Sequence, residues 1–228
     1  MNIFLIRHAI SEANLDKSVH GKVADHAIKL ANPLGIEQAQ NAGMFLNGYF
    51  NINFPNEKAR MWVSPYTRTR ETASEIITKT EPYILDVREN IHLVEQQYGL
   101  FDGISDPSIL LEIQQQHPNE WNYYQKQKKF EGKFWARMPL GESQFDVCLR
   151  VQQCFGTFQR DLQKHNIENI IIVAHGLSIR AFIMSWMHYP VEWFNNEENP
   201  NNCSIRLLQD NVDKGYIFEG FDKHKYKE

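Results

Sequence analysis

Apolar segments of two kinds alternate along this chain. Residues 2–6 and 169–174 are apolar almost throughout, which is the pattern of strands buried on both faces. Other segments repeat apolar residues at helical spacing, as 33–50 does after Pro33. The pattern predicts strands at 2–6, 61–63, 169–174, 204–208 and 216–218, less regular extended segments at 84–87 and 91–94, and helices at 33–50, 67–77, 143–165 and 177–188. This alternation predicts an α/β fold, a three-layer α/β/α sandwich with a largely parallel central sheet.

The domain organisation follows from length and from one unusual segment. The 228 residues contain no linker-like stretch, so we expect a single domain over 1–228 with a cap or insertion at about 104–140. Within it, residues 121–138 carry six aromatic, five basic and one acidic residue. The leading interpretation is an amphipathic helix packed on the core. A cap over a pocket ranks second, and a nucleic-acid or membrane surface a distant third.

Composition restricts the function classes. Net charge is −4, from 24 Lys and Arg against 28 Asp and Glu, which argues against a general nucleic-acid binder. The three cysteines, at 148, 154 and 203, form no Cys-x-x-Cys pair, which argues against a disulfide scaffold or a structural zinc site. No stretch reaches the ~18 apolar residues of a membrane span, and the chain begins with a strand instead of a secretion signal. We therefore expect a cytoplasmic protein with no membrane or nucleic-acid partner.

Polar residues follow three of the predicted strands directly. Arg7-His8 follows 2–6, Ser64 to Arg68 follows 61–63, and His175-Gly176 follows 169–174. Ligands of open α/β sheets bind beyond the carboxyl ends of the strands, so these clusters should meet at one edge. There an imidazole nitrogen can attack a phosphoryl group, while guanidinium groups hold its oxygens in a bidentate fork.

Each of these residues also has an ordinary structural interpretation. Arg68 fits a solvated helix as well as an anion clamp, and of the two nearby arginines we expect Arg68 inside and Arg70 in solvent. His175 is either a buried structural histidine or a donor to an anion beside a helix N-terminus. Asn14 suits a surface turn as well as an amide donor to phosphate.

A phosphoryl transfer also needs an acid for the leaving oxygen and later a base for water. Glu95 and Asp102 are the local candidates, and Glu95 follows an apolar pair that favours burial. The remaining histidines, at 20, 26, 92, 117, 165, 188 and 224, lack metal-ligand spacing, and we expect them to be structural or exposed.

Taken together, these motifs resemble the histidine phosphatase superfamily, also called phosphoglycerate mutase-like. The resemblance rests on Arg7-His8-Ala9, Ser11-Glu12-x-Asn14, Ser64-Pro65-x-x-Arg68, Glu95 and His175-Gly176, in that order over nearly the whole chain. Segments 139–143 and 199–204 are similar to its phosphatase-type members. One departure is Ala9, where the family usually has glycine, and this small residue should matter only if the position needs a positive φ.

The resemblance implies a role for each site residue. His8 would be the phosphorylated nucleophile, Glu95 the proton donor, and Arg7, Arg68 and His175 the ligands of the phosphoryl group. Asn14, Gly176, Leu177 and Tyr98 would complete the substrate-binding set, and the neighbouring arginines should lower the pKa of His8. The resemblance implies no cofactor and no metal, and a small phosphorylated substrate of unspecified identity.

Two alternatives to a phosphatase remain. A cofactor-dependent phosphoglycerate mutase is one, because Tyr98-Gly99 resembles the mutase segment, although 20–25 replaces the Gly-Trp-x-Asp stretch of mutases. The other is a non-catalytic phosphate-binding protein on the same fold. Oligomeric state stays open.

Overall fold

The computed structural model describes residues 1–104 and 106–222. Ser105, inside the predicted cap, and His224 lie outside the described residues. The strands are β1 (Asn2–Arg7), β2 (Ala59–Val63), β3 (Ile84–Glu89), β4 (Asn169–Ala174), β5 (Ile205–Gln209) and β6 (Val212–Phe218). The helices are α1 (Glu12–Leu15), α2 (Leu34–Asn53), α3 (Thr67–Thr80), α4 (Pro107–Gln116), α5 (Pro118–Phe130), α6 (Gln144–Gln152), α7 (Phe155–His165), α8 (Gly176–Met187) and α9 (Val191–Asn196).

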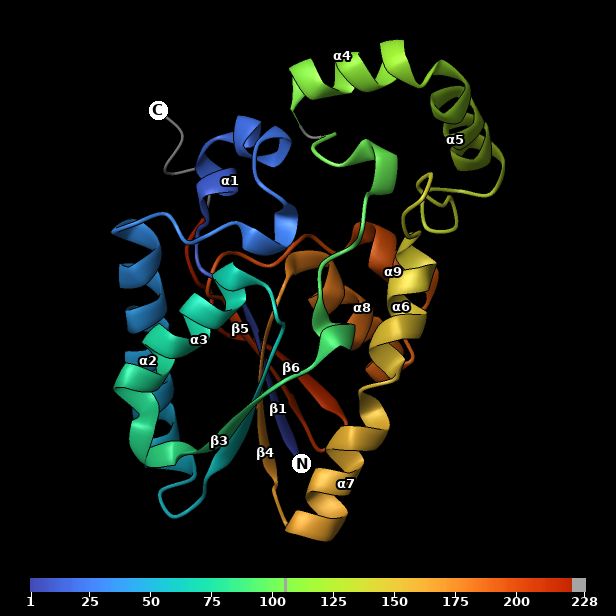
Figure 1. Cartoon of the computed structure of the whole chain (residues 1–228). Helices are drawn as coiled ribbons and strands as arrows, with labels where there is room; N and C mark the ends of the chain where they lie inside the picture. The colour runs from blue at the N-terminus through green and yellow to red at the C-terminus, as the bar shows by residue number, and fades with distance from the viewer. Residues whose placement is uncertain (105, 223–228) are drawn as a thin grey trace.

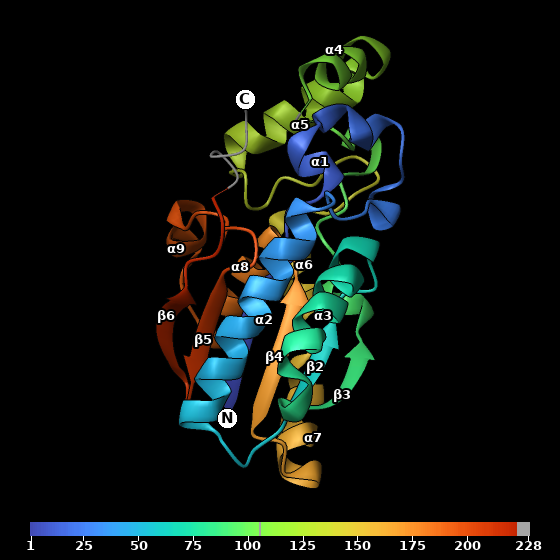
Figure 2. The same ribbon diagram turned by 90° about the vertical axis from the view of Figure 1, so that its left-hand side faces the viewer.

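The strands form one sheet in the order β3-β2-β4-β1-β5-β6. Strands β3, β2, β4 and β1 run parallel to one another, whereas β5 pairs antiparallel with both β1 and β6 at one side of the sheet. Helices α2 and α3 cover one face, and α7 and α8 cover the other (Figures 1 and 2). The predicted α/β architecture with a largely parallel central sheet is confirmed.

Strand β1 shows why the central strands carry an apolar run instead of alternation. Phe4 and Ile6 belong to the core between the sheet and α2 and α3, whereas Ile3 and Leu5 belong to the core beneath α7 and α8. All four are at most 1% exposed, and each buried side chain of this size contributes roughly 1.5–3 kcal/mol. Burial on both faces fixes the register of β1 and, with it, the position of its last residues.

Two predicted elements differ from the structure. The single helix expected over 143–165 is two helices, because tight i→i−3 hydrogen bonds at Gln153 and Cys154 end α6 before α7 begins. The break lets Val147 and Phe158 pack in different apolar clusters. The predicted start is right, since Ser143 and Asp146 form a capping box. Residues 91–93 form a 3₁₀ turn instead of an extended segment, because the Asn90 side chain accepts a hydrogen bond from the His92 backbone.

The segment expected to be a cap carries α4 and α5, which lie beyond the carboxyl ends of the parallel strands (Figures 1 and 2). Tyr124 of α5 packs on Phe101 and Trp121, in a small apolar cluster separate from the two sheet cores. Lys126, Lys128 and Lys129 are exposed. Helix α5 is therefore amphipathic, as the leading interpretation holds, but it packs on its own small cluster and not on the sheet.

A buried charge network joins the sheet to α7. Arg60 of β2 donates to Asp161 at 2.5 Å and to Asp86 at 2.6 Å, and Trp62 donates its indole N–H to Asp161 at 3.0 Å. The Arg60 and Asp161 side chains are each 5% exposed. Removing one member of such a pair leaves an uncompensated buried charge, which is strongly destabilising.

Asp161→Asn should therefore lower the free energy of unfolding by roughly 3 kcal/mol, measured by urea denaturation. The matched control is Glu89→Gln, which breaks the exposed Arg70–Glu89 pair, 53% and 50% exposed, and should cost less than ~1 kcal/mol. Equal losses in the two variants would contradict this account.

Candidate active site

The pairing of β4 with its neighbours brings the three predicted clusters to one edge of the sheet. The His8 backbone N–H donates to the carbonyl of Ala174 at 3.0 Å, and that of Ser64 donates to the carbonyl of Val173 at 3.0 Å. The rings of His8 and His175 then lie 5.3 Å apart, edge to face. The expected meeting of these strand ends is confirmed.

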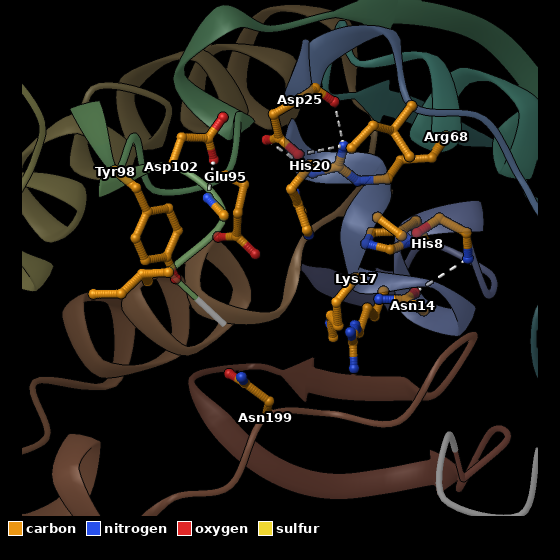
Figure 3. A pocket seen from close by; sticks show the side chains of 16 residues that line it. His8, Asn14, Lys17, His20, Asp25, Arg68, Glu95, Tyr98, Asp102 and Asn199 are labelled. Atoms are coloured by element: carbon orange, nitrogen blue, oxygen red, sulfur yellow. Dashed lines mark hydrogen bonds and ion pairs between the residues drawn. The ribbon is translucent and has the colours of Figure 1, made fainter. Parts of the chain in front are cut away.

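A cavity of about 310 Å³ opens over this edge (Figure 3). Its wall draws on β1, α1, α3, the segment after β3 and the loop before β5. The lining residues include Arg7, His8, Asn14, Lys17, His20, Asp25, Arg68, Glu95, Tyr98, Asp102 and Asn199. Of the nine predicted site residues, six are in this wall: Arg7, His8, Asn14, Arg68, Glu95 and Tyr98.

One hydrogen bond fixes the tautomer of His8. Nδ1 lies 2.7 Å from the carbonyl oxygen of Ala9, and because a carbonyl only accepts, Nδ1 carries the hydrogen and Nε2 keeps its lone pair. Burial, followed by the charges of Arg68 and Arg7, lowers the pKa of His8 well below its usual value. The ring is therefore neutral near pH 7. The backbone at Ala9 does not enter the positive-φ region, so alanine suits this position.

Two buried guanidinium groups stand beside His8. Arg7 donates from Nη1 to the carbonyl of Pro200 at 2.6 Å, and its Nε has no partner within the described protein. Arg68, in the first turn of α3, pairs with Asp25 at 3.0 Å and lies over the ring of Tyr66. Arg68 is buried as expected, whereas Arg70 pairs with Glu89 in solvent.

Glu95 reaches the wall from the segment after β3. Its carboxylate accepts from its neighbour's backbone N–H (Gln96, 3.0 Å) and, more loosely, from the Leu177 N–H at the start of α8 (3.4 Å) and the Ser178 hydroxyl (3.4 Å). Burial raises the pKa of Glu95 above its usual value, although Arg68 and Arg7 oppose the shift. Burial also raises the pKa of Asp102. Both carboxyl groups thus hold a proton more readily than usual.

Three predicted residues lie behind the wall. His175 is fully buried, with Nε2 2.8 Å from the Ser64 hydroxyl and Nδ1 without a partner in the described protein. Gly176 lies against Asn199, and the Leu177 side chain packs in an apolar cluster near Phe194.

Asn14 does reach the cavity. Its side-chain oxygen accepts from the Ser11 N–H at 3.1 Å, which leaves the amide N–H groups as donors.

Sequence reasoning missed several residues of the wall. Lys17, His20, Asp25 and Asn199 belong to loops whose approach depends on the tertiary fold. His20, which we expected to be a structural or surface residue, lines the cavity, and burial lowers its pKa.

Metal ligation and membrane insertion find no support in the described residues. Residues 1–104 and 106–222 contain no group of three or more His, Cys, Asp or Glu that could hold a metal ion. None of the helices in this part of the chain has the length and hydrophobicity needed to span a bilayer.

Comparison with known proteins shows the family to which this chain belongs. The chain belongs to the histidine phosphatase superfamily (branch 1), whose family model matches residues 3–218. It is 33% identical to the phosphoglycerate mutase-like protein AT74 of Arabidopsis thaliana, covering 91% of this chain and 64% of that protein. The chain thus spans somewhat less than two thirds of that relative's length.

Other relatives are phosphatases. The broad-range acid phosphatase DET1 of Saccharomyces cerevisiae is 23% identical over 91% of this chain and 84% of its own. The α-ribazole phosphatase of Shigella flexneri shares the fold with a TM-score of 0.68 at 19% identity, covering 96% of each chain. The family and the acid phosphatase support the prediction of a phosphomonoester hydrolase, whereas the α-ribazole phosphatase, at 19% identity, shows the fold alone.

The fork of Arg68 gives a direct binding prediction. Arg68→Lys keeps the charge but loses the planar pair of donors, so the Kd for inorganic phosphate should rise roughly tenfold or more, measured by calorimetry. Arg70→Lys, two residues further along α3 but exposed, is the matched control and should leave the Kd unchanged. An equal response of the two variants would remove Arg68 from the anion site.

Proposed function

We propose that this protein hydrolyses phosphomonoesters through a phosphohistidine on His8, with Glu95 as the proton donor. The observation that carries the proposal is the Nδ1–Ala9 hydrogen bond. It leaves Nε2 as the nucleophilic nitrogen in a cavity shared with two guanidinium groups and a buried carboxyl group. This combination supplies a nucleophile, charge stabilisation and an acid in one enclosed space.

In the first step, Nε2 of His8 attacks phosphorus and the bond to the leaving oxygen breaks. The Glu95 carboxyl group gives its proton to that oxygen, while Arg7 and Arg68 disperse the charge on the equatorial oxygens. The imidazole becomes cationic as the P–N bond forms. The carbonyl of Ala9, which accepts from Nδ1, stabilises that cation.

In the second step, water attacks phosphorus and passes a proton to the Glu95 carboxylate. The P–N bond breaks, the neutral imidazole of His8 returns and phosphate leaves. Nucleophile, acid and base are then all in their starting states. The guanidinium groups supply the positive charge that a metal ion provides in other phosphoryl transferases, so the reaction is proposed to be metal-independent.

Three further features belong to the proposal. The substrate is a small phosphorylated molecule, since the cavity is about 310 Å³. Segment 104–140 forms a cap on a single domain, because Ile104 lines the cavity and α4 and α5 stand beyond the strand ends. The protein acts in the cytoplasm, a reducing compartment that suits three buried free thiols.

A screen over many phosphomonoesters tests the proposal. The wild type should release phosphate from at least one of them with a chelator present, whereas His8→Ala should release none, because the nucleophile is lost. Phosphate release is measured by a colorimetric assay. Equal activity of His8→Ala, or complete loss of activity with the chelator, would refute the mechanism.

The pKa shifts predict the pH dependence. His8 is active when neutral, above its lowered pKa, and Glu95 is active when protonated, below its raised pKa. With an alkyl phosphate, kcat/KM should be bell-shaped after correction for substrate ionisation, with its acid limb below pH 6.5, the usual histidine value. Glu95→Gln should lower kcat/KM roughly 100-fold and abolish the basic limb. A basic limb that persists in this variant would assign the acid to another group.

A further inference from the structure

Arg150 of α6 forms hydrogen bonds with the backbone of the segment that carries Glu95. Its Nη1 donates to the carbonyls of His92 at 2.7 Å and Val94 at 3.0 Å, and its Nη2 lies 3.4 Å from the carbonyl of Glu95. These three carbonyls belong to an irregular segment between β3 and α4. A buried segment outside a sheet ladder needs partners for its carbonyls, and one guanidinium group supplies them.

Glu142 holds that guanidinium group in place. Its two carboxylate oxygens accept from Nε at 2.8 Å and from Nη2 at 2.9 Å, a bidentate pair whose side chains are 16% and 19% exposed. The Glu142 carboxylate also accepts from the backbone N–H of Gln97 at 3.0 Å, and the Gln96 side chain donates to the Glu142 carbonyl at 2.7 Å. The Glu142–Arg150 pair therefore binds the backbone before Glu95, through Arg150, and the two residues after it, through Glu142.

The other end of Glu95 is held by a different helix. The Ser178 hydroxyl of α8 donates to the Val94 carbonyl at 2.5 Å, and the Glu95 carboxylate lies 3.4 Å from the Leu177 N–H. Arg150 thus attaches the backbone of the Glu95 segment to α6, while the N-terminus of α8 contacts the Glu95 carboxyl group. Removing the first support leaves the segment held by α8 and by the contacts of Gln96 and Gln97 with Glu142, with the carbonyls of His92 and Glu95 no longer bound by Arg150.

We propose that Arg150, oriented by Glu142, is a positioning residue that places the Glu95 carboxyl group against the leaving oxygen of the substrate. The inference rests on the proposed role of Glu95 as the proton donor and deepens it. A displacement of about 1 Å at a reacting group costs up to roughly 100-fold in rate. The surroundings that hold the pKa of Glu95 above its usual value also change, because the Arg150 cation is lost, the Glu142 carboxylate is left without it and water can reach the loosened segment.

The test compares leaving groups. An alkyl phosphate needs a proton on its departing oxygen, whereas p-nitrophenyl phosphate expels a stable anion and needs it far less. In Arg150→Gln, kcat/KM for the alkyl substrate should fall roughly 10- to 100-fold, and for p-nitrophenyl phosphate less than ~3-fold. The basic limb of the alkyl profile should shift from its wild-type position.

Arg137→Gln is the matched control. Arg137 precedes α6, pairs with Asp146 of that helix and is 63% exposed. Both substrates should behave as with the wild type.

Two results separate the possible failures. If Glu95→Gln itself shows no difference between the substrates, the proposed role of Glu95 fails. If Glu95→Gln shows the difference but Arg150→Gln loses equal activity on both substrates with an unchanged basic limb, Arg150 is only structural and the inference is overturned. Should Arg150→Gln not fold, Glu142→Gln replaces it, because this variant leaves Arg150 and its contacts with the backbone carbonyls in place. The measurement is again the loss of kcat/KM on the alkyl substrate relative to the loss on p-nitrophenyl phosphate. Glu142→Gln should show a smaller loss, again confined to the alkyl substrate.

Discussion

The placement of β4 between β1 and β2 is the constraint on which the site depends. Parallel hydrogen bonding on both edges of β4 continues past the strand ends, where His8 and Ser64 donate to the carbonyls of Ala174 and Val173. A one-residue slip would turn each inward side chain to the opposite face of the sheet, and apolar layers on both faces oppose any slip. The proposed nucleophile, His8, is therefore placed by the most buried part of the molecule, while the proposed acid, Glu95, comes from an irregular segment that needs separate support.

The electrostatics of the site reflect this division. His8 stays neutral because it is buried beside two cations, and Glu95 favours protonation because burial outweighs the pull of the same cations. Within the described protein, Arg7 Nε and His175 Nδ1 are buried without partners. Unpaired buried groups of this kind cost roughly 1–3 kcal/mol each. An oxyanion beside His8 would accept from Arg7 Nε, which lines the cavity, so part of the binding free energy of the anion comes from relieving this cost.

The sequence predicted the strand ends well because each is a local pattern, an apolar run followed by a polar cluster. Arg7, His8 and Arg68 were found in this way, Glu95 was found as a carboxyl group after an apolar pair, and all four line the cavity. Lys17, His20 and Asp25 were missed because short turns carry them over the site, and no periodicity marks such turns. The break between α6 and α7 was missed for a related reason, since its cause is a choice between two packing surfaces and not a helix-breaking residue.

The central claim is that His8 carries the phosphoryl group during turnover. Its most direct test is to quench the reaction rapidly at alkaline pH, where phosphohistidine is stable. Peptide mass spectrometry then identifies the phosphorylated residue and distinguishes phosphohistidine from phosphoserine. The account predicts a phosphate on His8 that forms within a single turnover, disappears when substrate is exhausted, and is absent in His8→Asn. A phosphate on another residue, or continued turnover by His8→Asn without any phosphoenzyme, would contradict it.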